Sequence, residues 1–332
     1  MKQLLFVICL FVASTLSSCK KAMNADEISE KVSSGVVYIK NYFYYSVVLP
    51  NGEELFFNGI EDGELFGLTD DESEVTHKCS SCSGTGFFIT EDGIIMTNRH
   101  VARPDVSQEE VMAFLKDLKR ALKKRYISLM NDAVDKYNNL EGRPDLQQKY
   151  VNVYNSYKQA HETIDDMDMN DADIVTHTNL YILYNGSHFT KFEDLTPCNT
   201  IAVSEEESVD LALIQLDDEQ TPEGTFIFRL RDNDDELSLD QKLFMIGYNR
   251  GLTISQTSEG DIRPQTYSGN VSQKGDGDKV LYSIPSQPGS SGSPVIDEYG
   301  NLVAVHFAGW QGTQGFNYGI PSKKVRQFLK EN

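Results

Sequence analysis

The chain has 332 residues, of which 39% are hydrophobic and 24% charged, so it is long and apolar enough to bury a sizeable core. It carries 50 acidic and 30 basic residues, which gives a formal net charge of −20 at pH 7. Such an acidic surface argues against nucleic acid as a partner and against electrostatic docking on anionic lipid.

The N-terminus is typical of an export signal. Lys2 supplies a positive charge, and the apolar stretch 4–13 that follows is too short to span a bilayer. Leu16-Ser-Ser-Cys19 resembles a bacterial lipobox, in which the cysteine is diacylated and becomes the mature N-terminus. We therefore expect a lipoprotein signal peptide over residues 1–18, a linker over 19–30 that begins at the lipidated Cys19, and a lipid-anchored protein of the bacterial cell envelope, periplasmic or surface-facing. An ordinary signal peptide with an incidental cysteine is the alternative.

Three other cysteines remain after Cys9 and Cys19 are set aside: Cys79, Cys82 and Cys198. Cys79-Ser-Ser-Cys82 precedes a strand and does not open a helix, which disfavours a thioredoxin-like redox role. Together with His77 the three thiols could form a four-ligand zinc site. A local disulfide or plain buried thiols are favoured over it, and we expect neither a metal nor a cofactor.

A predicted β-hairpin leads to the first candidate catalytic residue. Residues 84–90 and 94–97 read as two strands joined by the turn Glu91-Asp92-Gly93. Asn98-Arg99-His100 follows directly, so His100 is expected at the end of a buried strand.

The next segment predicts a long helical hairpin over residues 104–168. Ser107 and Glu110 form a capping-box pattern, and apolar residues then recur every three or four positions up to Tyr137. Gly142 and Pro144 break this helix, and a second amphipathic pattern suggests an antiparallel return helix. Six basic residues lie in the middle of the first helix: Lys116, Lys119, Arg120, Lys123, Lys124 and Arg125. They indicate a solvated helix face or, as the alternative, a docking surface for an acidic partner.

Two further segments supply an acid and a nucleophile. Asp210 heads an apolar strand that ends at Leu216, where an isolated carboxylate is costly unless its charge is used, for instance to orient an imidazole. The pattern Gly-x-Ser-Gly fits Gly289 to Gly292 in one register, which selects Ser291 as the nucleophile. Glycine allows the turn in which the N–H groups of Gly289 and Ser291 form an oxyanion hole.

The order His100, Asp210, Ser291 is that of chymotrypsin, and the motifs around these residues resemble the trypsin-like (chymotrypsin-fold) serine peptidases. Thr97-Asn-Arg-His-Val101, Val209-Asp-Leu-Ala-Leu-Ile214 and Pro288-Gly-Ser-Ser-Gly-Ser-Pro-Val295 are most similar to the bacterial branch that holds the glutamyl endopeptidases and the HtrA-type proteases. The resemblance covers roughly residues 31–103 and 175–332. HtrA-type enzymes usually continue into a PDZ domain, and we expect none here.

The resemblance implies an all-β fold, a double β-barrel of chymotrypsin type with an inserted α-helical hairpin and a short C-terminal helix. We expect an N-terminal barrel over 31–225 that carries the hairpin, a C-terminal barrel over 226–321 and a terminal helix in 322–332. The implied function is a serine endopeptidase that hydrolyses proteins or peptides through an acyl-enzyme, with His100 as general base. The alternative is a catalytically inactive protease-like module that binds partners through its helical hairpin.

The resemblance also implies a specificity pocket. Ser286 falls where the family lines the floor of that pocket, and Pro285 stands next to it where trypsin-type enzymes carry an acid, so basic specificity is not expected. His306, followed by Phe307 and Gly309, resembles the histidine with which glutamyl endopeptidases grip a carboxylate. Ser286 and a charged His306 would therefore favour acidic residues before the scissile bond.

Overall fold

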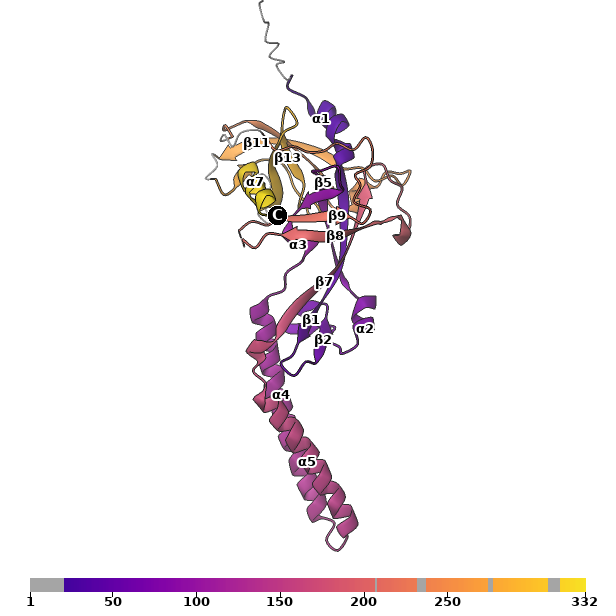
Figure 1. Cartoon of the computed structure of the whole chain (residues 1–332), viewed down its shortest axis with the longest axis vertical. Helices are drawn as coiled ribbons and strands as arrows, with labels where there is room; N and C mark the ends of the chain where they lie inside the picture. Colours follow the sequence, from indigo (N-terminus) through magenta and orange to yellow (C-terminus); the bar gives the residue numbers. More distant parts are fainter. Residues whose placement is uncertain (1–20, 207, 232–236, 274–276, 310–316) are drawn as a thin grey trace, which may run out of the picture.

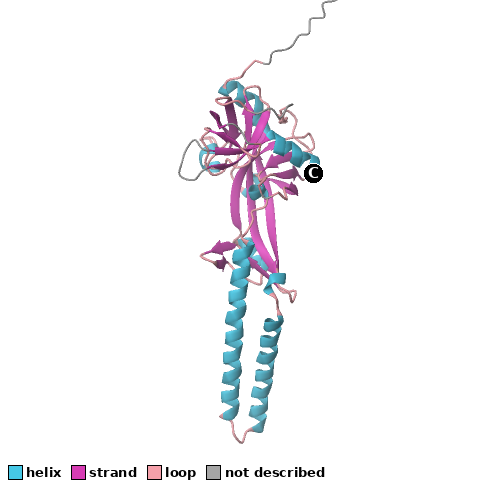
Figure 2. Cartoon of the chain, turned by 90° about the vertical axis from the view of Figure 1, so that its left-hand side faces the viewer, coloured by secondary structure: helices cyan, strands magenta, loops and turns pink. Residues whose placement is uncertain are grey.

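The computed structural model describes residues 21–206, 208–231, 237–273, 277–309 and 317–332. The predicted signal peptide 1–18 and the lipidation site Cys19 lie outside these residues. Figures 1 and 2 show a head of packed strands, a narrower stalk below it and a helical hairpin that projects from the stalk. Helix α1 lies at one end of the molecule and the tip of the hairpin at the other.

The first barrel closes because strand β1 pairs on both sides. Around the ring the order is β1-β5-β6-β9-β8-β7, with β1 antiparallel to both β5 and β7, and β2 adds to β1 outside the ring. These strands are β1 (Val36–Val48), β2 (Glu54–Phe57), β5 (Ser80–Phe88), β6 (Ile94–Thr97), β7 (Asp173–Tyr184), β8 (Thr196–Val203) and β9 (Ala212–Leu216).

The second barrel is also a closed ring, in the order β10-β11-β12-β15-β14-β13. Its strands are β10 (Lys242–Gly247), β11 (Gln265–Gln273), β12 (Val280–Tyr282), β13 (Pro294–Asp297), β14 (Leu302–Gly309) and β15 (Asn317–Pro321), with helix α6 (Leu252–Ser255) after β10. Two closed six-stranded rings make up the predicted chymotrypsin-type double barrel, and that prediction is confirmed for the described residues.

A shared apolar core fixes the two barrels against each other. Phe87 of the first barrel and Phe244 of the second are fully buried in one cluster, and Tyr38 meets Tyr248 edge to face with ring centroids 5.7 Å apart. Two amphipathic helices close the ends of this core: α1 (Ala25–Val32), followed by the 3₁₀ turn η1 (Ser33–Gly35), and the predicted C-terminal helix α7 (Ser322–Glu331). The cleft residues therefore stand on two barrels that cannot slide independently without exposing apolar surface.

The stalk has a core of its own. Strands β1 and β7 run on past the ring, in register from Val37↔Tyr184 to Val48↔Asp173. Tyr45, Val47 and Phe57 pack there with Val111 and Leu115, the first buried residues of the hairpin. The small elements around it are β3 (Gly59–Glu61), β4 (Glu64–Phe66), α2 (Glu72–His77), η2 (Met169–Asp171) and, nearer the barrel, η3 (Phe192–Asp194).

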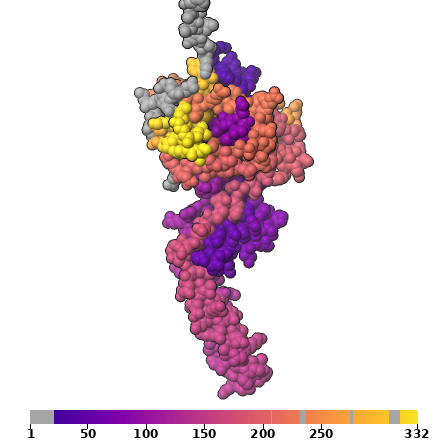
Figure 3. All heavy atoms as spheres, viewed as in Figure 1, coloured from indigo at the N-terminus to yellow at the C-terminus, as the bar shows by residue number. Residues whose placement is uncertain are grey.

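The predicted helical hairpin is present as α4 (Gln108–Asn138) and α5 (Pro144–Asp166). The Ser107 hydroxyl accepts a hydrogen bond from the Glu110 N–H at the start of α4, and Pro144 opens α5. With 31 residues, α4 extends about 45 Å, and Figure 3 shows the pair standing clear of the head. No described helix is both long and apolar enough to cross a membrane.

Half of the predicted basic surface is used inside the hairpin. Lys119 Nζ donates to the carbonyl oxygens of Asp165 and Met167, Lys123 pairs with Asp165, and Arg120 pairs with Asp117. Lys116, Lys124 and Arg125 are exposed and make no ion pair within the described part of the chain. Docking of an acidic partner on the hairpin stays a prediction, and three exposed cations remain to bind such a partner.

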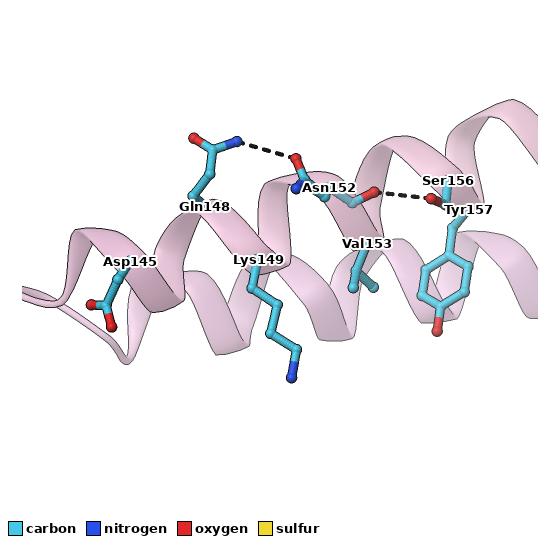
Figure 4. A pocket seen from close by; sticks show the side chains of 7 residues that line it. All are labelled: Asp145, Gln148, Lys149, Asn152, Val153, Ser156 and Tyr157. Carbon is cyan, nitrogen blue, oxygen red and sulfur yellow. Dashed lines mark hydrogen bonds between the residues drawn. The ribbon is translucent and has the colours of Figure 1, made fainter.

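The distal half of the hairpin contributes little buried surface. In α4 the buried residues are Val111, Leu115 and Ala133, and α5 has none. Figure 4 shows a shallow hollow there, lined by seven side chains of α5 alone, from Asp145 to Tyr157. A single helix face of this kind carries no catalytic group.

Shortening the hairpin therefore tests whether the rest of the protein folds without its distal half. Replacing residues 126–158 by a short Gly/Ser linker should leave the melting temperature nearly unchanged, because it removes one buried residue and keeps the Lys119 and Lys123 contacts. Leu115→Ala, at the base, should instead cost about 2–5 kcal/mol of unfolding free energy. Thermal and urea unfolding measure both, and an unfolded shortened protein would show that the distal hairpin belongs to the core.

Candidate active site

His100 is held by a short helix at the rim of the first barrel. Strand β6 ends at Thr97, and His100 lies in the first turn of α3 (Arg99–Ala102). The fully buried Asn41 side chain donates to the carbonyl oxygens of Val101 and Ala102, at 2.9 and 3.1 Å, and so fixes the far end of this turn. The imidazole is about half exposed, at 47%, and remains accessible to a substrate.

Asp210 meets His100 at two points. Its Oδ2 lies 2.6 Å from His100 Nδ1, and its Oδ1 accepts a hydrogen bond of 3.0 Å from the His100 backbone N–H. The Asn98 side chain donates to the Asp210 carbonyl oxygen at 2.7 Å. Because an ionised carboxylate is an acceptor, the close contact assigns the proton to Nδ1 and leaves Nε2 free to accept one.

Thr85 of strand β5 connects the loop that carries Ser291 to the first barrel. Its N–H donates to the Ser291 carbonyl oxygen and its hydroxyl to the Gly289 carbonyl oxygen, both at 2.8 Å. The Tyr248 N–H donates to the same hydroxyl, and the Thr97 hydroxyl donates to the Thr85 carbonyl oxygen. One fully buried residue thus ties the nucleophile loop of the second barrel to the strands that lead to His100.

Two glycines are required by this loop. Gly289 has φ of +99°, and a Cβ there would lie 2.4 Å from the Tyr248 carbonyl oxygen. Gly292 has φ of +85°, and a Cβ there would lie 2.1 Å from the Thr85 carbonyl oxygen. Both positions combine a left-handed backbone with a contact that leaves no room for a side chain.

The N–H groups of the loop divide into paired and unpaired ones. Those of Ser290, Gly292 and Ser293 donate to the carbonyl oxygens of Gln287, His306 and Ser290. Those of Gly289 and Ser291 donate to no acceptor among the described residues. Gly289 is buried and Ser291 half-buried, and an N–H group without a protein acceptor can donate to a substrate oxygen.

The loop also lies beside the residues that flank His100. A Cβ on Gly84 would lie 2.6 Å from the Val101 side chain and 3.2 Å from the Ser291 carbonyl oxygen, and a Cβ on Gly292 would lie 3.2 Å from the Asn98 N–H nitrogen. Within the described chain no hydrogen bond joins Ser291 Oγ to His100. Such catalytic contacts are often long before a substrate binds and shorten in the complex.

The predicted pocket residues are engaged with the protein itself. The Ser286 hydroxyl donates to Asn317 Oδ1 at 2.6 Å, and His306 Nδ1 lies 2.7 Å from the Tyr282 hydroxyl. Burial lowers the pKa of His306 to about 4; a hydrogen bond to the Tyr318 backbone acts against this, and the nearby charge of His100 adds to it. His306 is therefore neutral at pH 7 in this structure, which does not supply the positive charge expected to grip a carboxylate.

Sequence reasoning missed Thr85, Asn41, Asn317 and Tyr282. Asn41 and Tyr282 lie on strands β1 and β12, to which no motif pointed, and Asn317 begins β15. Thr85 lies in the predicted strand, where it reads as an ordinary β-branched residue. The cysteines Cys79, Cys82 and Cys198 are free thiols, and burial raises the pKa of Cys82 to about 11 and that of Cys198 to about 12.

Comparison with known proteins agrees with this geometry. Residues 170–305 match the trypsin-like peptidase domain family, a range that contains Asp210 and Ser291 and begins just after the hairpin. No curated protein matches the chain. Among solved structures it is similar to the serine endoprotease from Yersinia pestis, with 10% identity and a TM-score of 0.47 over 93% of this chain and 66% of that one. The family match over residues 170–305 supports the trypsin-like peptidase resemblance that the motifs predicted.

The neutral His306 predicts a pH dependence of stability. Its pKa in the folded protein, about 4, lies below the ordinary value of 6.5, so the unfolded chain binds the proton more tightly. Above about pH 6.5 this contribution to the free energy of unfolding is fully present. It is lost as the pH falls toward about 4, which lowers the free energy of unfolding by about 3 kcal/mol.

Urea unfolding at several pH values measures this effect. The His306→Gln variant, which keeps a hydrogen-bonding side chain, should lose less stability than the wild type between pH 6.5 and 4. Equal losses in the two proteins would show that His306 is not held neutral by burial.

Proposed function

We propose that the protein is a serine endopeptidase that cleaves peptide bonds through an acyl-enzyme. The observation that carries the proposal is the combination of two features at one place. Asp210 holds His100 by two hydrogen bonds, and the loop of Ser291, tied to the same barrel by Thr85, presents two unpaired N–H groups. A base, a hydroxyl and an oxyanion site are the groups that acyl transfer requires.

In this mechanism Ser291 Oγ attacks the carbonyl carbon while His100 Nε2 takes its proton. The carbonyl oxygen becomes an oxyanion and accepts hydrogen bonds from the Gly289 and Ser291 N–H groups. Asp210 stabilises the imidazolium ion that forms. His100 then gives the proton to the leaving amine, and a water molecule, deprotonated by His100, hydrolyses the ester and restores Ser291.

The alternative is an inactive module that binds partners through the hairpin. Such a module has no requirement for a carboxylate held against an imidazole at 2.6 Å or for two unsatisfied backbone donors beside a serine. The geometry therefore favours the enzyme.

An acidic preference before the scissile bond stays a prediction. To bind a carboxylate there, Ser286 would have to release Asn317 and His306 would have to take up a proton against its burial. Both changes oppose binding at pH 7, so we do not extend the proposal to this preference.

Kinetics of active-site variants test the proposal. Ser291→Ala and His100→Ala should each lower kcat on the order of 10⁶-fold, and the double variant should lose little more, because the residues act as a unit. Ser290→Ala, one residue away and buried with its hydroxyl donating to the Gln287 carbonyl oxygen, is the matched control. Substantial peptidase activity in Ser291→Ala would refute the mechanism.

We also propose that the protein is lipid-anchored at Cys19, on the strength of the lipobox pattern. Expression in a bacterial host with labelled fatty acid should give a labelled protein in the membrane fraction, and Cys19→Ala should abolish the label. An unlabelled wild-type protein would contradict the anchor.

A further inference from the structure

One cation, Arg250, borders the active-site loop, and a second, Lys40, lies on a strand of the first barrel. Arg250 follows β10, and its backbone N–H donates to the Pro288 carbonyl oxygen at 2.7 Å, directly before Gly289. Its side chain is exposed and reaches the neutral amide of Gln287 at 3.5 Å. Arg250 is thus next to the residue whose N–H we assign to the oxyanion hole.

Lys40 belongs to strand β1 of the first barrel. It is the register partner of Ser83 in the β1–β5 pair, and a Cβ on Gly251 would lie 3.3 Å from Ser83 Oγ. Ser83 precedes Gly84, which borders the Ser291 carbonyl oxygen. The 250–251 turn therefore lies beside Ser83, and the Lys40 ammonium lies further along β5, at Ser81.

Neither positive charge is neutralised by the protein. Arg250 and Lys40 make no ion pair with any carboxylate of the described residues. Lys40 Nζ donates to the Ser81 hydroxyl at 2.7 Å and lies 5.1 Å from the centre of the Tyr42 ring.

The backbone at Arg250 is unusual as well. Its φ is +59°, a left-handed conformation that glycine, asparagine or aspartate adopts more readily than arginine. An arginine adopts this conformation at a conformational cost. Strained residues of this kind concentrate at functional sites.

The nucleophile loop separates two walls of the cleft. Ser286 contacts β15 through Asn317, whereas Gln287, Pro288 and Gly289 contact the 248–251 segment and Thr85. With the residue before the scissile bond at the Ser286 wall, the other wall, of Ser83 and Arg250 with Lys40 further along, is available to the residues after it.

We propose that Arg250 and Lys40 form a subsite for acidic side chains, Asp or Glu, at the first positions after the scissile bond. The inference rests on the proposed endopeptidase function and names its substrate class: peptides that are acidic on the leaving-group side. A guanidinium and an ammonium group bind carboxylates by charge-assisted hydrogen bonds. The pair also gives an acidic enzyme a local means of attracting an acidic substrate.

Cleavage of a proteome-derived peptide library tests the proposal, since each cut creates a new N-terminus whose residues are read by mass spectrometry. Asp and Glu should be enriched within the first three positions after the cut. Arg250→Gln and Lys40→Gln should each lower kcat/KM for acidic substrates about fivefold, and together roughly 20-fold, with no loss for the matched Asn and Gln substrates. Raising the ionic strength should weaken the preference.

The control variant is Lys242→Gln, an exposed cation at the far end of β10, which should keep the preference. Arg250→Glu should move the enrichment from acidic to basic residues. Gln is a suitable replacement at position 250 because it has the same left-handed strain as Arg, and Lys40→Gln provides an independent variant should Arg250 prove essential for folding.

Fluorophosphonate labelling of the same samples distinguishes a failure of the subsite proposal from a failure of the endopeptidase proposal. Full labelling with no acidic enrichment, or with enrichment that neither variant changes, overturns this subsite and leaves the endopeptidase proposal standing. No labelling and no cleavage overturn the endopeptidase proposal and the subsite with it.

Discussion

The arrangement of the candidate active site depends on the four hydrogen bonds of Thr85. Three of them reach the second barrel, at Ser291, Gly289 and Tyr248, and the fourth reaches Thr97, three residues before His100. Because Thr85 is fully buried between the barrels, these bonds are shielded from water and the loss of any one would leave an unsatisfied group. Packing in the interior thereby holds the loop of Ser291 against the strand that leads to His100.

The candidate catalytic residues stand out in the sequence, whereas the residues that position them do not. His100, Asp210 and Ser291 lie in short segments whose chemistry is local: a strand end, an isolated acid and a glycine-flanked serine. Thr85 and Asn41 act through partners that are distant in sequence, 204 positions away for Gly289 and 60 for Val101. The neutrality of His306 follows from its burial, which sequence pattern does not reveal. The helical hairpin was predictable because its apolar period and end signals are local.

The shape of the molecule relates the proposed lipid anchor to the barrels and the hairpin. The stalk and hairpin extend from the head in the direction opposite to α1 (Figure 1), and the described chain begins next to α1. A lipid anchor at Cys19 would therefore leave the hairpin pointing away from the membrane, with Lys116, Lys124 and Arg125 exposed along it. The two barrels would lie between the anchor and the hairpin.

The most direct test of the account is the site of a fluorophosphonate adduct, located by mass spectrometry of the digested protein. The account predicts one adduct, on Ser291, which disappears in His100→Ala and persists when residues 126–158 are replaced by a linker. An adduct on another serine, or labelling of Ser291 that does not depend on His100, would contradict the claim that the two barrels assemble a working triad.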